Sequence, residues 1–497
     1  MKRSGTITVL GAGASADAGY PLAGDFIEPF TESLKEADQK DSELRKKIEE
    51  FILQHGGKAD SIPKGGASHL EWFQERWNRF VEVHKKTKSL AITKLNENGR
   101  PSIKSQVIYD TPIGFPALTP YSTIIEEATY SEPYLETFFA FYDDYVRPII
   151  FALENDLRKL RIYQDRFRTI RRVAIETVFR ELSAYNRPNA DYLSSLFKLP
   201  GPKKHGFTIA TLNHDVTIEQ TASQSKIPLY DGFNSAPTAI SSLPVGWDEQ
   251  GFEELKKRWE TTAKNCYEYI GFQDVPNEAN LLLKLHGSLG WYVMEEGIGD
   301  IGFRDELRYN SAYKYFRLPY SKIWITKKED IVEQLVRGLA TLNNDNYVLT
   351  QKAGNVWIQP YLVFARATKT HPDRLILDIM TTFNQLLDNA ENILVIGYSW
   401  GDPHINDLIL DAIARGASLV NVSKSAIQKN ALALWEQRFQ TTFSVLKKRL
   451  FMFGGGAKRV LEEGKIELPS GESHDIDLIE TLKQGLPPDF SLDKTLR

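Results

Sequence analysis

The feature that most constrains the fold is the segment TITVLGAGASADAGYP at residues 6–21, where a short apolar run breaks into glycine and alanine. Residues 6–10 favour a β-strand, and the small residues after them can open a helix. Gly11, Gly13 and Ala16 match the pattern G-x-G-x-x-A, in which missing side chains let backbone N–H groups approach a phosphate. The segment predicts a dinucleotide-binding turn or, alternatively, only a tight strand-to-helix turn.

An acidic residue that usually accompanies such a turn is missing. Dehydrogenases of this type carry it at the end of a second strand, about 20 positions further on. Glu32 and Glu36 fall in that window, but they lie on a helical pattern over residues 31–54. The ordinary plan of a hydride-transferring enzyme is therefore disfavoured.

Strand patterns recur along the chain, and several are continuous apolar runs of the kind buried on both faces of a parallel sheet. They cover residues 207–213, 281–288, 356–364, 392–399 and 417–423. Helical patterns separate the last three strands, at 376–387 and 405–414. This alternation predicts an α/β fold with a Rossmann-like, doubly wound and mostly parallel sheet.

The length of 497 residues leaves room for additions to such a sheet. We expect the domain built on this sheet to consist of residues 1–30, 131–221, 281–292 and 356–424. Residues 31–130 are predicted to be a mostly helical insertion, and 222–280 and 293–355 are predicted to be further insertions. Residues 425–497 are predicted to form a C-terminal extension that serves assembly.

Composition and charge narrow the class of protein. A net charge of -4 removes the electrostatic argument for wholesale binding to nucleic acid or membrane. The basic run at 158–172 is interpreted as a solvated helix face, with a contact surface for a partner or nucleic acid as the alternative. The single cysteine, Cys266, allows no internal disulfide and fits a cytoplasmic location. No segment approaches the ~20 apolar residues of a membrane-spanning helix.

Two polar clusters stand at the carboxyl ends of predicted strands. They are Thr211, Asn213 and Asp215 in TLNHD, and His286, Gly287 and Ser288 in KLHGS. A lone strand-end Asn or His is often structural, because it makes turn hydrogen bonds. Ligands of open α/β sheets, however, bind at the carboxyl ends of the strands. We therefore expect both clusters to converge on one crevice with the glycine turn.

The remaining histidines give no metal site. His214, His371 and His404 lack the HExxH spacing or the paired carboxylates that a metal-binding set needs. The segment WGDPHIND instead predicts the start of a helix, with Asp402 as N-cap and Pro403 as the first helical residue. We expect no metal.

Five separated motifs together resemble the sirtuin fold, in the order that sirtuins use. They are GAGASADAGYP, TLNHD, LHGS, GYS at 397–399 and the strand end at Asn421. The likeness is greatest to bacterial sirtuin-like proteins that hydrolyse NAD+ in anti-phage defence. Deacylases of the family carry a four-cysteine zinc module and continue the first motif with Pro-Asp-Phe-Arg, where this chain reads PLAGDF. The resemblance therefore implies NAD+ binding and puts protein deacylation in doubt.

The resemblance also implies individual roles. Gly11, Gly13, Ser15 and Ala16 would cradle the diphosphate, and Gly397, Ser399 and Asn421 would hold the adenosine side. Further residues expected in the binding site are Ala12, Gly19, Pro21, Thr211, Gly287 and Ser288. Asn213 would hold the nicotinamide ribose and a water, Asp215 the carboxamide, and His286 would act as a base on a ribose hydroxyl.

These residue types suit cleavage of the nicotinamide–ribose bond. The reaction passes through an oxocarbenium-like state, and neutral histidine suits general-base work at cellular pH. We expect an NAD+ glycohydrolase that depletes NAD+ in abortive infection, controlled by oligomerisation or by a second defence protein. For the latter, the family suggests a DNA-translocase ATPase or an Argonaute-like protein. The alternative is an NAD+- or ADP-ribose-binding sensor or scaffold without turnover, and a deacylase is the least favoured reading.

Overall fold

The computed structural model describes thirteen segments of the chain. They are residues 4–26, 29–30, 32–33, 177–178, 181–182, 190–202, 205–234, 267–273, 275–276, 278–296, 313–317, 356–362 and 374–496. The chain divides into two compact units, Met1–Leu22 with Ala174–Arg497, and Ala23–Val173. The predicted insertion at 31–130 and the basic run at 158–172 lie almost wholly outside the described residues. The first unit contains the elements described below.

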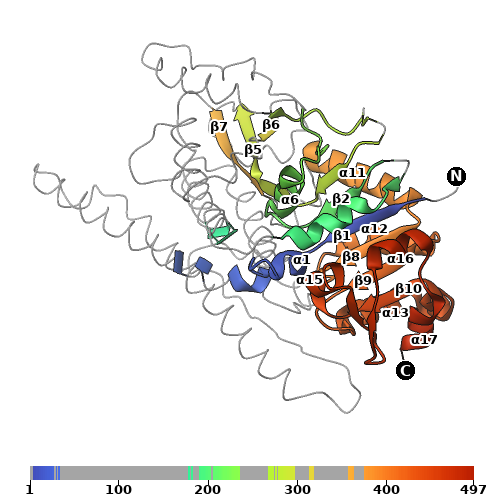
Figure 1. Ribbon diagram of the computed structural model, residues 1–497. Coiled ribbons are helices and arrows are strands. Elements are labelled where there is room, and N and C mark those ends of the chain that lie inside the picture. Colours follow the sequence, from blue (N-terminus) through green and yellow to red (C-terminus); the bar gives the residue numbers. More distant parts are fainter. Residues whose placement is uncertain are drawn as a thin grey trace, which may run out of the picture. The chain divides into compact units, whose positions relative to one another are not determined.

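A six-stranded parallel sheet forms the centre of the first unit (Figure 1). In pairing order its strands are β10 (Leu450–Phe453), β9 (Ser418–Val422), β8 (Asn392–Ile396), β1 (Thr6–Leu10), β2 (Thr208–Thr211) and β4 (Leu281–Lys284). The chain builds outward from β1 through β2 to β4, then returns to the other side of β1 with β8, β9 and β10. This is the strand order of the Rossmann fold, which confirms the predicted α/β class.

Helices cover both faces of this sheet. One face packs against α11 (Arg374–Asn389), α12 (Pro403–Ala414) and α13 (Lys429–Phe439), and the other against η4 (Asp191–Lys198), α6 (Thr217–Gln224), α15 (Gly456–Leu461) and α16 (Leu478–Gln484). Successive strand residues alternate between the two cores: Ile393 and Val395 enter the first, Leu394 and Ile396 the second. Burial on both faces is the reason that these strands read as continuous apolar runs.

A second, antiparallel sheet follows β4 in the chain. Its strands, in pairing order, are β3 (Tyr267–Glu268), β6 (Tyr313–Arg317), β5 (Gly287–Glu296) and β7 (Val356–Leu362). The strand predicted at 356–364 belongs to this sheet and pairs antiparallel with β5, which corrects its expected place in the parallel sheet. In the described sheet β7 is an edge strand with β5 as its neighbour. This position suits Pro360, because proline has no backbone N–H to donate to a second neighbouring strand.

The segment 425–497, predicted as a C-terminal extension, supplies the sixth strand of the main sheet. β10 pairs with β9 from Leu450 opposite Leu419 to Phe453 opposite Val422. After β10, helix α15 packs on the second face, and β11 (Lys465–Glu467) forms a hairpin with β12 (Ser473–Asp475). A division at residue 424 therefore cuts through the sheet.

We expect Phe453→Ala to lower the free energy of unfolding of the whole sheet by about 3–5 kcal/mol, because it empties a fully buried site in β10. Urea unfolding followed by tryptophan fluorescence measures the loss. Val445→Ala is the matched control, since that side chain is 67% exposed and should change the value by less than about 0.5 kcal/mol. Equal midpoints for the two variants would show that residues 425–497 unfold apart from the sheet.

Candidate nucleotide site at the strand ends

The strand order creates one point in the sheet where the chain reverses its direction of travel. β1 lies between β2 and β8, so successive crossovers leave it first on one side and later on the other. Ligands of open α/β sheets bind outside the carboxyl ends of the strands at such a topological switch point. The predicted glycine turn follows β1 and the GYS motif follows β8 (Figure 1), so both border the switch point.

The glycines at the switch point allow two turns to touch. Gly13 donates its N–H to Gly397 O at 2.9 Å, and Gly11 donates to Ile396 O at 3.0 Å. A Cβ added to Gly11 would lie only 2.6 Å from Gly397 O, and Gly397 itself has φ of +64°. Contact between the two turns is thus one reason for glycine here, in addition to the predicted approach of a phosphate.

Two contacts brace the glycine turn and its four-residue helix α1 (Gly13–Ala16) from the second face of the sheet. The Tyr192 hydroxyl of η4 donates to Ala14 O at 2.7 Å, and burial raises the pKa of this hydroxyl, so it remains a donor. Asp17 Oδ2 accepts the backbone N–H of Lys458, in α15, at 2.9 Å. The turn is therefore held from outside as well as by its own hydrogen bonds.

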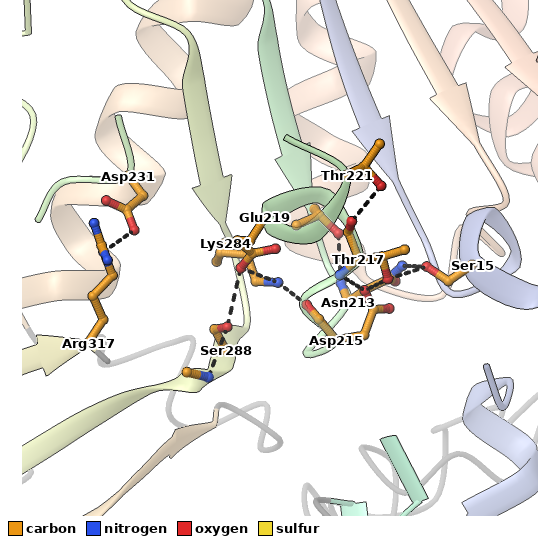
Figure 2. Close-up of polar contacts among 12 residues, drawn as sticks. Ser15, Asn213, Asp215, Thr217, Glu219, Thr221, Asp231, Lys284, Ser288 and Arg317 are labelled. Atoms are coloured by element: carbon orange, nitrogen blue, oxygen red, sulfur yellow. Dashed lines mark hydrogen bonds and ion pairs between the residues drawn. The ribbon is translucent and has the colours of Figure 1, made fainter. Parts of the chain in front are cut away.

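Asn213 joins the end of β2 to the glycine turn, as Figure 2 shows. Its Nδ2 donates to Gly11 O at 3.1 Å and to Ser15 Oγ at 3.2 Å, and its backbone N–H donates to Thr211 Oγ1 at 3.1 Å. Because Gly11 O can only accept, these contacts orient the amide and leave Oδ1 as its accepting atom. The structure thus brings four of the predicted site residues together.

Asp215 bonds to the first residue of the helix that follows it. Its Oδ1 accepts the backbone N–H of Thr217, the first residue of α6, at 3.0 Å, and the Thr217 hydroxyl donates to the same oxygen (Figure 2). Thr217 Oγ1 in turn lies 3.4 Å from Ser15 Oγ. These contacts give Asp215 a structural task at the start of α6, and its predicted contact with a carboxamide stays a prediction.

A buried ion pair supports both polar clusters from within the second core. Lys284 Nζ lies 3.2 Å from Glu219 Oε1, with both side chains 1% exposed, and it also donates to the backbone oxygen of Asp215. Burial raises the pKa of the Glu219 carboxyl, and the charge of Lys284 opposes that shift. Ser288 Oγ lies 3.5 Å from Glu219 Oε1, so the pair links TLNHD to KLHGS (Figure 2).

His286, which follows β4, contacts the carboxylate of Asp402, which follows β8 on the opposite flank of the sheet. Its Nε2 lies 3.0 Å from Asp402 Oδ2, and both residues are buried. Asp402 Oδ1 accepts the N–H of His404 at 3.1 Å, and Pro403 begins α12, which confirms the predicted helix cap. The rings of His286 and His214 have their centroids 6.1 Å apart. The switch point therefore carries a histidine–carboxylate pair.

Asn421 is buried, and its side chain is hydrogen-bonded to other residues of the protein. Its Oδ1 accepts the indole N–H of Trp400 at 3.1 Å, its Nδ2 donates to Gln428 Oε1 at 3.0 Å, and it is 1% exposed. Gln428 in turn donates to Tyr398 O at 2.8 Å. This arrangement favours a structural role for Asn421, and its predicted contact with adenosine stays a prediction.

The other predicted binding residues lie along the same turns. Ala12, Ala16, Gly19 and Pro21 follow β1; Thr211 ends β2; Gly287 and Ser288 begin β5; and Ser399 follows β8. Ser399 and Gly19 are exposed, whereas Ser288 is fully buried. Ser288 therefore contributes to the site through Glu219 and through the N–H of Gly290, which it accepts at 3.3 Å.

The sequence did not predict three residues of the strand-end site: Glu219, Lys284 and Asp402. A lysine inside the apolar run LLLKLHGS was a usable signal, because a charge in a buried strand needs a buried partner. Nothing local pointed to Glu219 as that partner. The N-cap pattern predicted the role of Asp402 at the start of the helix, which uses one carboxylate oxygen. It could not predict the contact of the second oxygen with His286.

Two kinds of feature are absent from the segments that the structure describes. No group of three or more His, Cys, Asp or Glu side chains in them is placed to hold a metal ion. Within the same segments no helix has both the length and the apolar character needed to cross a membrane. Cys266 and His371 lie outside them.

Comparison of the sequence with protein-family models gave no match, and no curated protein matched it. The class therefore follows from the fold and from the strand-end groups. The chain is an α/β protein with a Rossmann-like parallel sheet, and its candidate nucleotide site lies at the switch point beside β1.

We expect Lys284→Met to lower the free energy of unfolding by roughly 3–5 kcal/mol near neutral pH, because it leaves the Glu219 carboxylate buried without its cation. A folded-state carboxyl pKa above the unfolded value means that stability falls as pH rises, so the loss should be smaller at about pH 5 than at about pH 8. Urea unfolding at both pH values measures it.

The matched variant is Lys284→Met combined with Glu219→Leu, which removes both charges. It should lose clearly less than the single variant, because no unpaired charge remains buried. A double variant that is less stable than Lys284→Met alone would contradict the interpretation of the pair.

Proposed function

We propose that this chain is an NAD+ glycohydrolase, which cleaves the bond between nicotinamide and ribose. The observation that carries the proposal is the contact of the Asn213 amide with Gly11 and Ser15, which joins the predicted catalytic asparagine to the predicted diphosphate turn. The resemblance of the five sequence motifs to sirtuins and to sirtuin-like NAD+ hydrolases supports the same reading.

The order of the strands supports a definite direction for the bound dinucleotide. The turn assigned to the diphosphate follows β1, in the middle of the sheet. Gly397 and Ser399, assigned to the adenosine side, follow β8 on one flank, whereas Asn213 and His286, assigned to the nicotinamide side, follow β2 and β4 on the other. The three groups therefore stand in the order adenosine, diphosphate, nicotinamide ribose, as one extended NAD+ molecule requires.

The reaction needs a water, a base and stabilisation of positive charge. The bond between ribose C1′ and the nicotinamide nitrogen breaks, and its electron pair leaves with neutral nicotinamide. The oxygen of water bonds to C1′, and one water proton is released. Asn213 Oδ1, oriented by the two bonds from Nδ2, faces the developing positive charge or holds the water. His286 accepts the proton of a ribose hydroxyl, and that ribose oxygen takes up the proton that water releases, so that one proton in total passes to His286.

A second candidate is a sensor or scaffold that binds NAD+ without turnover, and the internal bonds of Asp215 and Asn213 fit it equally well. Asp215 Oδ1 already serves the start of α6, and both amide donors of Asn213 already serve the glycine turn. Groups committed to internal bonds suit a rigid binding site as well as a catalytic one. Measurement of turnover separates the two candidates.

The cellular role that we propose rests on the same resemblance. An enzyme that consumes NAD+ must be silent until it is needed, so we propose control by oligomerisation or by a second protein in anti-phage defence. A DNA-translocase ATPase or an Argonaute-like protein is the proposed partner class.

We expect purified protein, alone or assembled with a candidate partner, to release nicotinamide from NAD+. Asn213→Ala and His286→Ala should each reduce the rate by about 100-fold or more, because they remove charge stabilisation and the base. Chromatographic quantification of nicotinamide measures the rate.

Two residues outside the predicted site offer matched controls. Asn430 in α13 is exposed and His474 in β12 is half-buried, and Asn430→Ala and His474→Ala remove the same chemical groups and should leave the rate unchanged. Thermal melting should accompany each assay, because Asn213→Ala also removes two hydrogen bonds of about 1 kcal/mol each. Absence of nicotinamide release from every assembly, together with NAD+ binding by calorimetry, would decide for the sensor.

A further inference from the structure

The contact between His286 and Asp402 spans the carboxyl end of the sheet. His286 stands two residues after β4, and Asp402 stands at the start of α12, which follows β8. In the sheet, β1 and β2 lie between β8 and β4. The bond of 3.0 Å from Nε2 to Oδ2 therefore joins the two flanks of the switch point across the strands that carry the glycine turn and Asn213.

Hydrogen bonds within its own loop and helix fix the position of Asp402. Its Oδ1 accepts the N–H of His404, and its own N–H donates to the Tyr398 hydroxyl at 3.1 Å. The Tyr398 hydroxyl in turn donates to Asn406 Oδ1 at 2.8 Å. The positive end of the 12-residue helix α12 favours the negative form of a carboxylate at this position. His286 thus meets an anchored and negatively charged oxygen.

The chemistry of the two groups decides which one donates the hydrogen bond. A carboxylate can only accept, so Nε2 of His286 carries the hydrogen and the lone pair of the neutral ring lies on Nδ1. When the ring takes up a second proton, the carboxylate stabilises the imidazolium.

We propose that Asp402 is the positioning residue of His286: it selects the ring tautomer, fixes the ring orientation and stabilises the imidazolium formed when His286 accepts a proton. The inference rests on the proposed NAD+ cleavage, in which His286 is the base. The interaction itself can be measured without turnover.

Other charged or titratable groups stand in β4, in α6 and in the loop after β2. His214 has its ring centroid 6.1 Å away, and a charge on it would oppose protonation of His286. Lys284 and Glu219 pair with each other at 3.2 Å, so their charges largely cancel. Asp215 stands beside that pair through its backbone contact with Lys284. Among these described groups, the Asp402 carboxylate is the one in direct hydrogen-bond contact with His286.

The first test is a histidine titration by NMR on the NAD+-free protein labelled at histidine Cε1. Asp402→Asn keeps an oxygen that can cap α12 but removes the negative charge. We expect the pKa of His286 to fall by about one unit or more in this variant. Asp407→Asn, an exposed acid on the same helix, makes the same charge change without the contact and should leave the titration unchanged. His286→Gln assigns the signal.

The second test uses nicotinamide release over a range of pH. We expect Asp402→Asn to slow the reaction by about 100-fold or more and to move the acidic limb of the pH–rate profile to lower pH, because the base loses its proton more readily. Asp407→Asn should keep both rate and profile. Should Asp402→Asn fail to fold, Asp402→Ser replaces it, because serine is an equally good N-cap without a charge.

The outcomes separate this inference from the proposed function. An unchanged His286 titration in Asp402→Asn overturns the positioning role, whatever the turnover. A lowered pKa with an unchanged pH–rate profile also overturns it and leaves the pair as a structural link. If the wild-type protein releases no nicotinamide in any assembly, the proposed function fails, and the titration alone then decides whether Asp402 controls His286.

Discussion

The candidate site depends on a contact between two backbones. The turn after β1 and the turn after β8 meet without intervening side chains, and Gly13 donates its N–H directly to Gly397 O. A methyl group on Gly11 would press against the same oxygen. Because the two turns touch, the halves of the sheet built on either side of β1 bring their strand ends to one place. Asn213, His286 and Asp402 all stand after the carboxyl ends of strands in this sheet.

The polar groups at this place are layered from the core outward. Deepest lies the pair of Lys284 and Glu219, which ties the two loops together and supports the backbone of Asp215. Above it, Asn213 and the pair of His286 and Asp402 have part of their bonding capacity fixed by the protein. Groups fixed in this way need little rearrangement when charge develops beside them, which is the condition for electrostatic stabilisation of a transition state.

Much of the fold was predictable, because each parallel strand carries its signal locally. Burial on both faces makes such a strand a continuous apolar run, and Asp402 with Pro403 marks a helix start within two residues. The place of β7 was not predictable in this way, because an apolar strand does not reveal which sheet it joins. β10 was missed for the same kind of reason: its pairing with β9 depends on residues some thirty positions earlier. The partners of His286 and Lys284 are likewise 116 and 65 residues distant, and nothing in a local pattern encodes such pairings.

The hydrogen bond between Asp17 and Lys458 can form only late in the synthesis of the chain, because 441 residues separate the two partners. A ribosome adding ~5–20 residues per second needs roughly 20 to 90 s to travel from one end to the other. During that time the glycine turn exists without the helix that holds Asp17, and β1 exists without the neighbour that it meets in β8. A nascent chain therefore lacks the completed site until long after its first strand has emerged.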